Sequence, residues 1–269
     1  MKSPLRYPGG KTRAVKLLND KISHHLDTFR VDKVCSPFFG GGSFEIHLAE
    51  RGYRVYGYDV FLPLVNFWQK TLEDVDRVAD RAEEYRAAFE SGDARALFRS
   101  LQHQLPGMVP TYQSAAVFFV LNRASFSGST LSGGMSPGYP RFNQGSIDRL
   151  RQFSTLNLTV EKADYRDSIS RHGEDVFIYL DPPYMIDDAL YGDRGSTHRN
   201  FDHEGLVSIL KTRGNWCMSY NDLPEIRDLY QDFEIESVSW TYGMGANKES
   251  NEVLIYSHDF AHEPTLLFD

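Results

Sequence analysis

The sequence has few cysteines, no long apolar run and no low-complexity segment. Its two cysteines, Cys35 and Cys217, lie far apart and outside any C-x-x-C pattern, which excludes a disulfide scaffold and a cysteine-rich zinc site. The 12 prolines and 21 glycines are spread along the chain, which argues against wholesale disorder. No window approaches the roughly 18 consecutive apolar residues of a membrane-spanning helix, so we expect no membrane partner.

Targeting and metal-binding patterns are missing as well. Residues 1–16 are basic but have no apolar stretch behind them, so they do not resemble a secretory signal. Together with the low cysteine content, this favours a reducing, cytoplasmic setting. The nine histidines show no H-E-x-x-H or H-x-E spacing, and we expect that no metal is required.

Charge is abundant but unevenly distributed. The chain has 269 residues, of which 41% are apolar and 25% charged, and this predicts one large domain or a core with a modest insert. The net charge is −8, yet residues 1–16 and 94–155 carry +5 each, which leaves −18 on the remainder. Two basic zones on an acidic body are compatible with a local phosphate-binding face, or with chance clustering of solvated side chains.

Short apolar runs that end in small or acidic residues predict an α/β fold. A strand over 31–39, a glycine turn, a helix over 43–51 and a second strand over 54–58 form a βαβ unit, which implies a parallel sheet. Further strands are predicted at residues 157–161, 175–180, 215–220, 233–240 and 252–256.

A segment of different character interrupts this pattern between residues 61 and 145. Apolar spacings of three, four and seven predict a helix over 68–89, which should stop near Gly92. Two more helices are predicted at 94–105 and 114–123, followed by a Gly-, Ser- and Pro-rich loop or hairpin over 124–145. We therefore predict a catalytic part formed by residues 1–60 and 146–269, with a mainly helical recognition domain inserted over 61–145.

The glycine turn favours a nucleoside-type ligand. Gly40, Gly41 and Gly42 directly follow the first strand, where glycine lets the backbone approach a ligand closely as a helix begins. Asp59 follows Gly42 by 17 residues, at the end of the next strand, where a carboxylate can accept hydrogen bonds from ribose hydroxyls. A turn that merely needs positive φ is the alternative interpretation.

The tetrapeptide Asp181-Pro182-Pro183-Tyr184 follows an apolar strand. Two prolines cannot continue a central ladder, so the chain leaves the sheet as a stiff loop. A carboxylate and a peptide carbonyl held there can both accept N–H bonds from a planar exocyclic amine and localise its lone pair. The aromatic ring beside them can stack on a nucleobase. An ordinary proline-rich exit loop is the alternative.

These motifs, with Tyr7-Pro8-Gly9-Gly10-Lys11 and Asp164-Tyr165, make the chain resemble the DNA N6-adenine methyltransferases of the deoxyadenosine methylase type. The resemblance implies a Rossmann-like catalytic sheet and S-adenosylmethionine as cofactor. It implies double-stranded DNA as partner, with base flipping followed by direct in-line transfer to the N6 amine of adenine. A bacterial, archaeal or phage-encoded protein is expected, either monomeric or weakly dimeric.

The resemblance also implies roles for individual residues. Asp181 and Pro182 would hold the target amine, beside Pro183, and Tyr184 would stack on the flipped base. The implied contacts with DNA lie in the insert, at Asn122, Arg123, Ser127 and Arg141. The residues implied to bind the cofactor are Tyr7, Gly9, Gly10, Lys11, Phe39, Gly40, Gly42, Asp59, Asp164, Tyr165 and Asp181.

Other functions stay open at this point. Methylation of another planar amine, in RNA or in a glutamine side chain, would use the same chemistry, although Asp181 and the basic insert favour a nucleobase in DNA. A non-catalytic DNA-binding relative would keep the fold without turnover. A dinucleotide-dependent oxidoreductase would use the glycine turn but would leave residues 181–184 unexplained.

Overall fold

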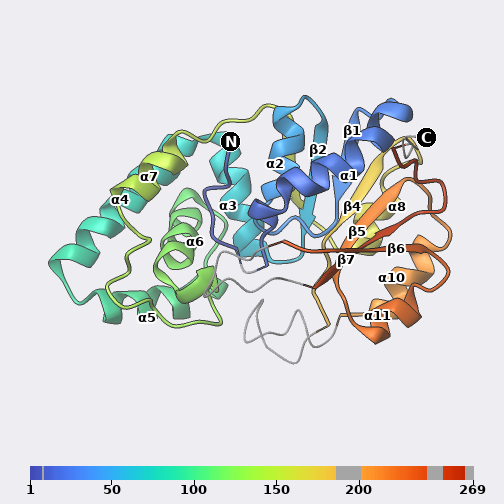
Figure 1. Ribbon diagram of the computed structural model, residues 1–269. Helices are drawn as coiled ribbons and strands as arrows, with labels where there is room; N and C mark the ends of the chain where they lie inside the picture. The colour runs from blue at the N-terminus through green and yellow to red at the C-terminus, as the bar shows by residue number, and fades with distance from the viewer. Residues whose placement is uncertain (8, 186–200, 241–250, 264–269) are drawn as a thin grey trace.

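The described strands form one mixed sheet. The computed structural model describes residues 1–7, 9–185, 201–240 and 251–263, and its strands lie in the order β3-β2-β1-β4-β5-β7-β6 (Figure 1). Neighbours from β3 to β5 are parallel, whereas β7 is antiparallel to β5 and β6. The predicted α/β class with a Rossmann-like sheet is confirmed. The strands are β1 (Lys33–Ser36), β2 (Arg54–Asp59), β3 (Leu158–Lys162), β4 (Phe177–Leu180), β5 (Trp216–Asn221), β6 (Glu234–Val238) and β7 (Glu252–Tyr256).

Helices cover both faces of this sheet. In β4, Phe177 and Tyr179 face one apolar core while Ile178 and Leu180 face the other, as the two-residue period of a strand requires. Burial on both faces explains why central strands such as β4 appear in the sequence as continuous apolar runs. The edge strands β3 and β6 are partly exposed. The first core is covered by α1 (Val15–Thr28) and α2 (Ser43–Glu50), and the second by α8 (Tyr165–Ser170), α10 (His203–Leu210) and α11 (Pro224–Leu229).

The insert is a cluster of helices beside the sheet (Figure 1). The prediction of a single helix over 68–89 is wrong in one respect, because the helix is interrupted at Asp74. Asp74 has extended φ and ψ of −159° and 92°, and its side chain accepts from the backbone N–H of Arg77, so it caps a new helix. The helices are α3 (Leu62–Glu73), α4 (Val75–Ser91), α5 (Ala94–Gln104), α6 (Tyr112–Ala124) and α7 (Gln144–Arg151).

The insert shares a core with the sheet instead of having its own. Trp68 of α3 packs edge-on against Phe39, with ring centroids 5.3 Å apart, and its indole N–H donates to the carbonyl of Gly40 at 3.0 Å. Helix α7, which the sequence placed mostly in the catalytic part, packs on α4. Its Arg151 pairs with Asp76 and Asp80 of that helix.

The loop predicted over 124–145 is mostly irregular. It begins with a short 3-10 turn (Phe126–Gly128), and Ser125 and Met135 form an isolated antiparallel bridge. Ser127 has a left-handed φ of 57° and Gly128 a φ of 80°. These two residues turn the chain sharply where α6 ends.

Within the described ranges, every helix is too short or too polar to cross a lipid bilayer.

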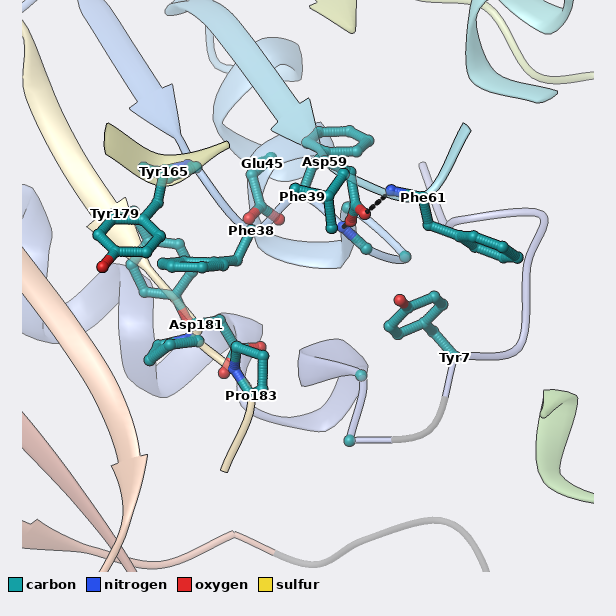
Figure 2. Close-up of a pocket in the computed structure, with 18 of the residues that line it drawn as sticks. Tyr7, Phe38, Phe39, Glu45, Asp59, Phe61, Tyr165, Tyr179, Asp181 and Pro183 are labelled. Carbon is teal, nitrogen blue, oxygen red and sulfur yellow. Dashed lines mark hydrogen bonds between the residues drawn. The ribbon is translucent and has the colours of Figure 1, made fainter. Parts of the chain in front are cut away.

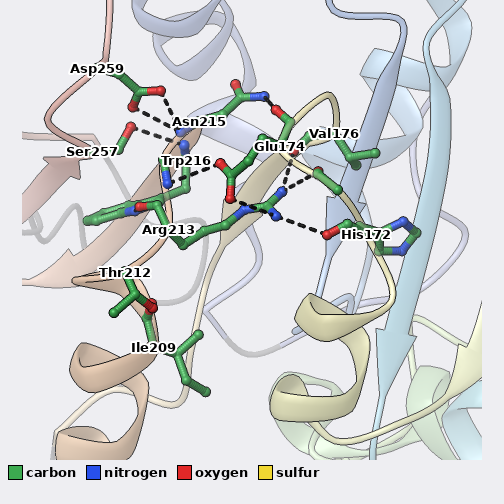
Figure 3. A network of polar contacts seen from close by, with 12 residues as sticks. His172, Glu174, Val176, Ile209, Thr212, Arg213, Asn215, Trp216, Ser257 and Asp259 are labelled. Atoms are coloured by element: carbon green, nitrogen blue, oxygen red, sulfur yellow. Dashed lines mark hydrogen bonds and ion pairs between the residues drawn. The ribbon is translucent and has the colours of Figure 1, made fainter.

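A buried arginine ties together the loops at the amino-terminal edge of the sheet (Figure 3). The guanidinium of Arg213, whose side chain is 9% exposed, donates to the carbonyls of His172 at 2.9 Å, Gly173 at 2.6 Å and Val176 at 3.0 Å. Asn215 adds a bond from its side-chain amide to the carbonyl of Glu174 at 2.9 Å. The connections that precede β4 and β5 are therefore fixed far from the carboxyl ends of these strands.

Arg213→Ala is expected to destabilise the protein by about 2–3 kcal/mol, because it leaves the partly buried carbonyl groups of His172 and Val176 without this donor. Urea denaturation gives this free energy. The matched control is Arg171→Ala, which removes an exposed pair with Glu161 at 3.1 Å and is expected to change stability by no more than about 0.5 kcal/mol. Equal losses in the two variants contradict the role given to Arg213.

Candidate active site

The candidate site lies at the carboxyl edge of the sheet, where the strand order reverses. β1 and β4 are neighbours, but β2 and β3 continue to one side of β1 while β5 continues beyond β4. Chains that leave β1 and β4 in opposite directions open a crevice, which is the usual ligand position in such sheets. A cavity of about 340 Å³ occupies it (Figure 2). It is lined by all the residues predicted to bind cofactor and by Pro182, Pro183 and Tyr184.

The glycine turn after β1 forms the floor of the cavity under Tyr7. Gly40 and Gly42 have left-handed φ values of 49° and 63°, a conformation that other residues adopt at a cost. A Cβ atom on Gly40 would lie 2.9 Å from Cε1 of Tyr7, and one on Gly41 would lie 2.7 Å from its Cβ. Positive φ at Gly40 and Gly42 and the close approach of Tyr7 therefore both require glycine here, and the close approach of a ligand stays a prediction.

Phe39 supports the turn from below. A Cβ atom on Gly42 would lie 2.5 Å from its Cζ, and one on Gly57 of β2 would lie 2.4 Å from its Cδ2. The Phe39 ring is buried and contacts Trp68 of the insert. The structure thus gives Phe39 a packing role, which positions the turn for a ligand.

Asp59 at the end of β2 closes the other side of the turn. Its carboxylate accepts from the backbone N–H of Gly40 at 3.1 Å. It also accepts from the backbone N–H of Phe61 at 2.9 Å (Figure 2). Burial raises the pKa of this carboxyl, while the backbone hydrogen bonds oppose the rise. The carboxylate lies in the cavity wall beside Phe61, a ring that sequence reasoning did not single out.

Aromatic rings form the wall on the β3 and β4 side. Asp164 caps α8 through the backbone N–H of Arg166 at 2.9 Å, and Tyr165 packs against Phe38 at 5.8 Å and Phe201 at 5.4 Å. Burial raises the pKa of Tyr165 to about 12. Phe38 and Phe201 also line the cavity, so a flat ring could be enclosed here.

The Asp181 carboxylate is held from two sides. Its Oδ1 accepts from the ammonium of Lys11 at 2.6 Å and from the hydroxyl of Ser219 at 3.0 Å. Lys11 is 4% exposed and begins the short turn Lys11–Arg13, whereas Ser219 lies on β5. Residues from two distant segments therefore fix the orientation of one carboxylate. The sequence indicated roles for Asp181 and Lys11 and none for Ser219.

Tyr184 is the second partner of the Lys11 ammonium. Its hydroxyl accepts from Lys11 Nζ at 2.7 Å and donates to the Glu252 carboxylate. Its ring stacks on Tyr220, with centroids 5.6 Å apart and planes inclined by 20°. The Tyr220 hydroxyl in turn donates to the carbonyl of Pro183 at 3.1 Å. The proline corner is thus stiffened by hydrogen bonds as well as by its own rings.

Two buried glutamates near Asp181 were not predicted. Glu45 of α2 lines the cavity and accepts from the Ser36 hydroxyl at 2.7 Å, while Glu252 begins β7. Burial raises the pKa of each carboxyl to about 7. Glu45 lies on an apolar helix that directly follows the first strand and the glycine turn. This position was the only feature of the sequence that indicated a role for it at the site.

Two of the expected DNA contacts are interior residues. Asn122 is fully buried and Arg123 is 7% exposed, and burial lowers the pKa of Arg123 to about 10. The expectation that their side chains touch DNA is therefore corrected: in this structure they face the inside of the insert. Ser127 and Arg141 lie instead in the loop that follows α6, where Arg141 is exposed.

Asn122 and Arg123 fasten the amino-terminal segment to the insert. The Asn122 amide accepts from the backbone N–H of Arg6 at 2.9 Å and donates to the carbonyls of Arg6 at 2.7 Å and Gly128 at 3.0 Å. Arg123 Nε donates to the carbonyl of Arg141 at 3.0 Å. We call this set of contacts the Asn122 clamp. It places Tyr7, the residue after Arg6, over the glycine turn.

The described residues contain no group of three or more His, Cys, Asp or Glu side chains arranged to hold a metal ion.

The comparisons with known proteins agree with this geometry. The family model of D12 class N6 adenine-specific DNA methyltransferases matches residues 7–244. The chain is 26% identical over 243 residues to a DNA adenine methylase of Serratia marcescens, covering 84% of this chain and 86% of that protein. It is 24% identical over 259 residues to the type II methyltransferase M.MjaIII of Methanocaldococcus jannaschii, with 87% and 89% covered.

A third relative, the type II methyltransferase M1.LlaDCHI of Lactococcus lactis subsp. cremoris, is 20% identical over 274 residues, with 91% of this chain and 90% of that protein covered. The family match includes the glycine turn, Asp59 and the proline corner, and extends across the whole insert. The chain therefore belongs to the D12 class of N6 adenine-specific DNA methyltransferases and is an enzyme that methylates adenine in DNA.

Proposed function

We propose that the methyl donor is S-adenosylmethionine and that it binds in the cavity between the glycine turn and the Asp164–Tyr165 wall. The support is the cavity itself: the glycine turn, Asp59, Asp164 and Tyr165 all line it. The turn keeps its shape there because a Cβ atom on Gly40 or Gly42 would lie within 3 Å of the Tyr7 or Phe39 ring. When bound, this donor supplies an electrophilic methyl group on a positively charged sulfur. Carboxylates around the cavity favour such a cation.

In this proposal, segments that converge on the cavity hold the donor. Gly9, Gly10 and Gly40 present backbone near Tyr7, and Asp59 offers carboxylate oxygens on the far side of the turn. Asp164 and Tyr165 would contact the base of the donor, beside Phe38. The cavity also includes Asp181, so the donor and the target amine would meet at the proline corner.

We propose that the Asp181 carboxylate and the Pro182 carbonyl accept the two N–H bonds of the target adenine amine. Because Oδ1 of Asp181 already has two donors, Oδ2 is the oxygen directed to the amine. These acceptors pull the nitrogen towards tetrahedral geometry and stabilise the positive charge that develops on it. This fixed corner is the observation that carries the proposal, together with Tyr184 as a stacking ring.

Access to the amine requires that the adenine leave the base stack, which costs a few kcal/mol. We propose that the loop over 124–145 faces the duplex and that Ser127 and Arg141 contact it there. Phe126 is 70% exposed beside Ser127, so its ring is available for contact with the duplex. The enzyme would act in the cytoplasm, as a monomer or weak dimer.

The test is transfer of labelled methyl from S-adenosylmethionine to duplex DNA, with hydrolysis of the product to nucleosides. We expect label in N6-methyladenine alone. RNA of the same sequence and a glutamine-containing peptide are offered in parallel, because label in either would favour another planar amine. Absence of label in any adenine-containing DNA, with the donor bound, would favour a non-catalytic relative.

Arg141→Ala is expected to weaken binding to the methylated sequence by about tenfold and to reduce the slope of log affinity against log salt by about 1. The substitution keeps the Arg141 carbonyl that Arg123 binds, so the fold is preserved. Arg81→Ala, on the exposed face of α4 with Glu84 as its partner, is the control and should leave both quantities unchanged. An unchanged salt slope for Arg141→Ala removes it from the DNA surface.

A further inference from the structure

Methyl transfer to the amine releases a proton that the proposed function has not yet assigned. The nitrogen lone pair forms the new N–C bond, the broken C–S bond leaves its electron pair on sulfur, and one N–H bond of the amine breaks. The Asp181 carboxylate is the first base that this proton meets. To return to its ionised form for the next turnover, Asp181 must pass the proton on.

A continuous chain of hydrogen bonds leads away from Asp181 into the protein. Lys11 Nζ lies 2.6 Å from Asp181 Oδ1 and 2.7 Å from the Tyr184 hydroxyl. The Tyr184 hydroxyl donates to Glu252, whose side chain is 2% exposed. Lys11 is 4% exposed. The chain thus joins the amine-binding carboxylate to a second, buried carboxylate.

We infer that Glu252 receives the proton released from the target amine, by way of Asp181, Lys11 and Tyr184. This inference rests on the proposed function, because it concerns the same amine. Glu252 acts through Tyr184 and Lys11 without touching the substrate, so it is a positioning residue and the terminal proton acceptor.

The bonds already point in the required direction. Lys11 donates to the Tyr184 oxygen and Tyr184 donates to Glu252. Movement of one proton along each bond protonates Glu252, restores the Tyr184 hydroxyl and leaves Lys11 neutral. Lys11 then takes the proton from Asp181. The balance is one proton lost from the amine and one gained by Glu252, with the three intermediate groups unchanged.

The surroundings of Glu252 suit an acceptor that works near neutrality. Burial raises its pKa to about 7, the charge of Asp181 acts in the same direction, and the Lys11 charge and the Tyr184 hydrogen bond oppose the rise. Its strand partners, Asn221 on β5 and Val238 on β6, bring no charge. The titratable groups that shift its pKa in this way are Lys11, Tyr184 and Asp181.

Glu45 provides a matched comparison inside the same site. It is buried to a similar degree and its pKa is also raised to about 7. Its carboxylate, however, accepts from Ser36 and stands outside the chain that runs from Asp181 to Tyr184. A general effect of buried negative charge would act through both glutamates, whereas a proton path runs through Glu252 alone.

The test is the single-turnover rate of N6-methyladenine formation between pH 5.5 and 8.5, with donor and DNA saturating. We expect the wild-type rate to rise about tenfold per pH unit below pH 7 and to level off above it, because Glu252 must be ionised to accept. Glu252→Gln should be about 10²-fold slower at pH 8 and independent of pH across this range. Glu45→Gln should keep the inflection near pH 7, whatever its rate.

Tyr184→Phe supplies a second variant, because it keeps the stacking ring and removes the hydroxyl. In the double variant, the loss of single-turnover rate caused by Tyr184→Phe should not add to the loss caused by Glu252→Gln, since either change interrupts the same path. Additive losses, or an inflection that survives in Glu252→Gln and disappears in Glu45→Gln, overturn the inference. Wild-type transfer at pH 8 tests the proposed function by itself, so the two can fail separately.

Stability against pH locates the Glu252 titration without donor or DNA. Its pKa is raised in the folded protein, so its neutral form favours folding and that contribution is lost as the pH rises through about 7. Between pH 5 and 7.5 the free energy of unfolding of the wild type should therefore fall relative to Glu252→Gln. A constant difference between the two proteins would show that Glu252 does not titrate there and would overturn the inference.

Discussion

Asp181→Ala is expected to reduce the single-turnover rate of methyl transfer, measured with the methyl donor saturating, by at least about 10³-fold. The variant removes the group that localises the lone pair of the amine and stabilises the charge developing on nitrogen. It also leaves the Lys11 ammonium, which is 4% exposed, with Tyr184 as its remaining partner in this set. A modest loss of thermal stability should therefore accompany the loss of rate.

Two further variants separate the charge of Asp181 from its position. Asp181→Asn keeps the volume and one carbonyl oxygen and should be slow but measurable. Ser219→Ala removes one of the two donors to Oδ1 and keeps the carboxylate, so we expect a loss of about tenfold. If Asp181→Ala retains a rate within tenfold of the wild type, the amine is held elsewhere and the assignment of the proline corner is wrong.

Gly42→Ala is expected to weaken binding of S-adenosylmethionine by about 10- to 100-fold. The left-handed φ of 63° at this position costs a non-glycine residue about 1–3 kcal/mol, and the new Cβ would lie 2.5 Å from Cζ of Phe39. Relief of that overlap must move either the turn or the ring on which it rests. Titration calorimetry with the donor, in the absence of DNA, measures the effect.

Gly138→Ala is the matched control for this variant. Gly138 has nearly the same φ, 64°, but an added Cβ there meets nothing within 4 Å, and the residue is outside the cavity lining. It should lose comparable stability from backbone strain and bind the donor as the wild type does. Equal donor affinities in the two variants would show that the shape of the turn does not govern binding.

The catalytic half of the fold was predictable because its signals are local. Each of the described strands was expected within a few residues, and in central strands such as β4 burial on both faces selects continuous apolar runs. The proline corner was equally visible, because Pro182 and Pro183 must leave the ladder. The helices α1, α8, α10 and α11 were missed. The last three have only six to eight residues, which is too short for a helical period to show.

The candidate site was only half predictable. Asp59 and Asp181 end strands, so sequence position alone placed them at the carboxyl edge. Ser219 and Glu252 lie on β5 and β7, and their contact with Asp181 and Tyr184 depends on which strands become neighbours. A buried glutamate cannot be told from an exposed one by its immediate sequence, because its partners come from elsewhere in the chain.

The error at Asn122 and Arg123 has a physical reason. Basic and amide residues in an insert suggest a contact surface, but these two end α6, whose residues from Ser114 to Ala124 are all buried. A helix that is apolar on every side is an interior helix, and the uninterrupted run of apolar residues 115–121 carried that signal. Its polar end therefore serves the backbone of other segments, not a ligand.

The Asn122 clamp has a consequence for engineering the specificity of this enzyme. Asn122 binds both the Arg6 backbone and the Gly128 carbonyl. The loop proposed to contact DNA and the first residues of the chain are therefore held together as one structural unit. Gly128 lies so close to Arg6 that a Cβ atom would fall 2.0 Å from its carbonyl oxygen. The insert therefore cannot be exchanged on its own between relatives. A chimaera that takes the insert of a relative should also take the first seven residues of that relative.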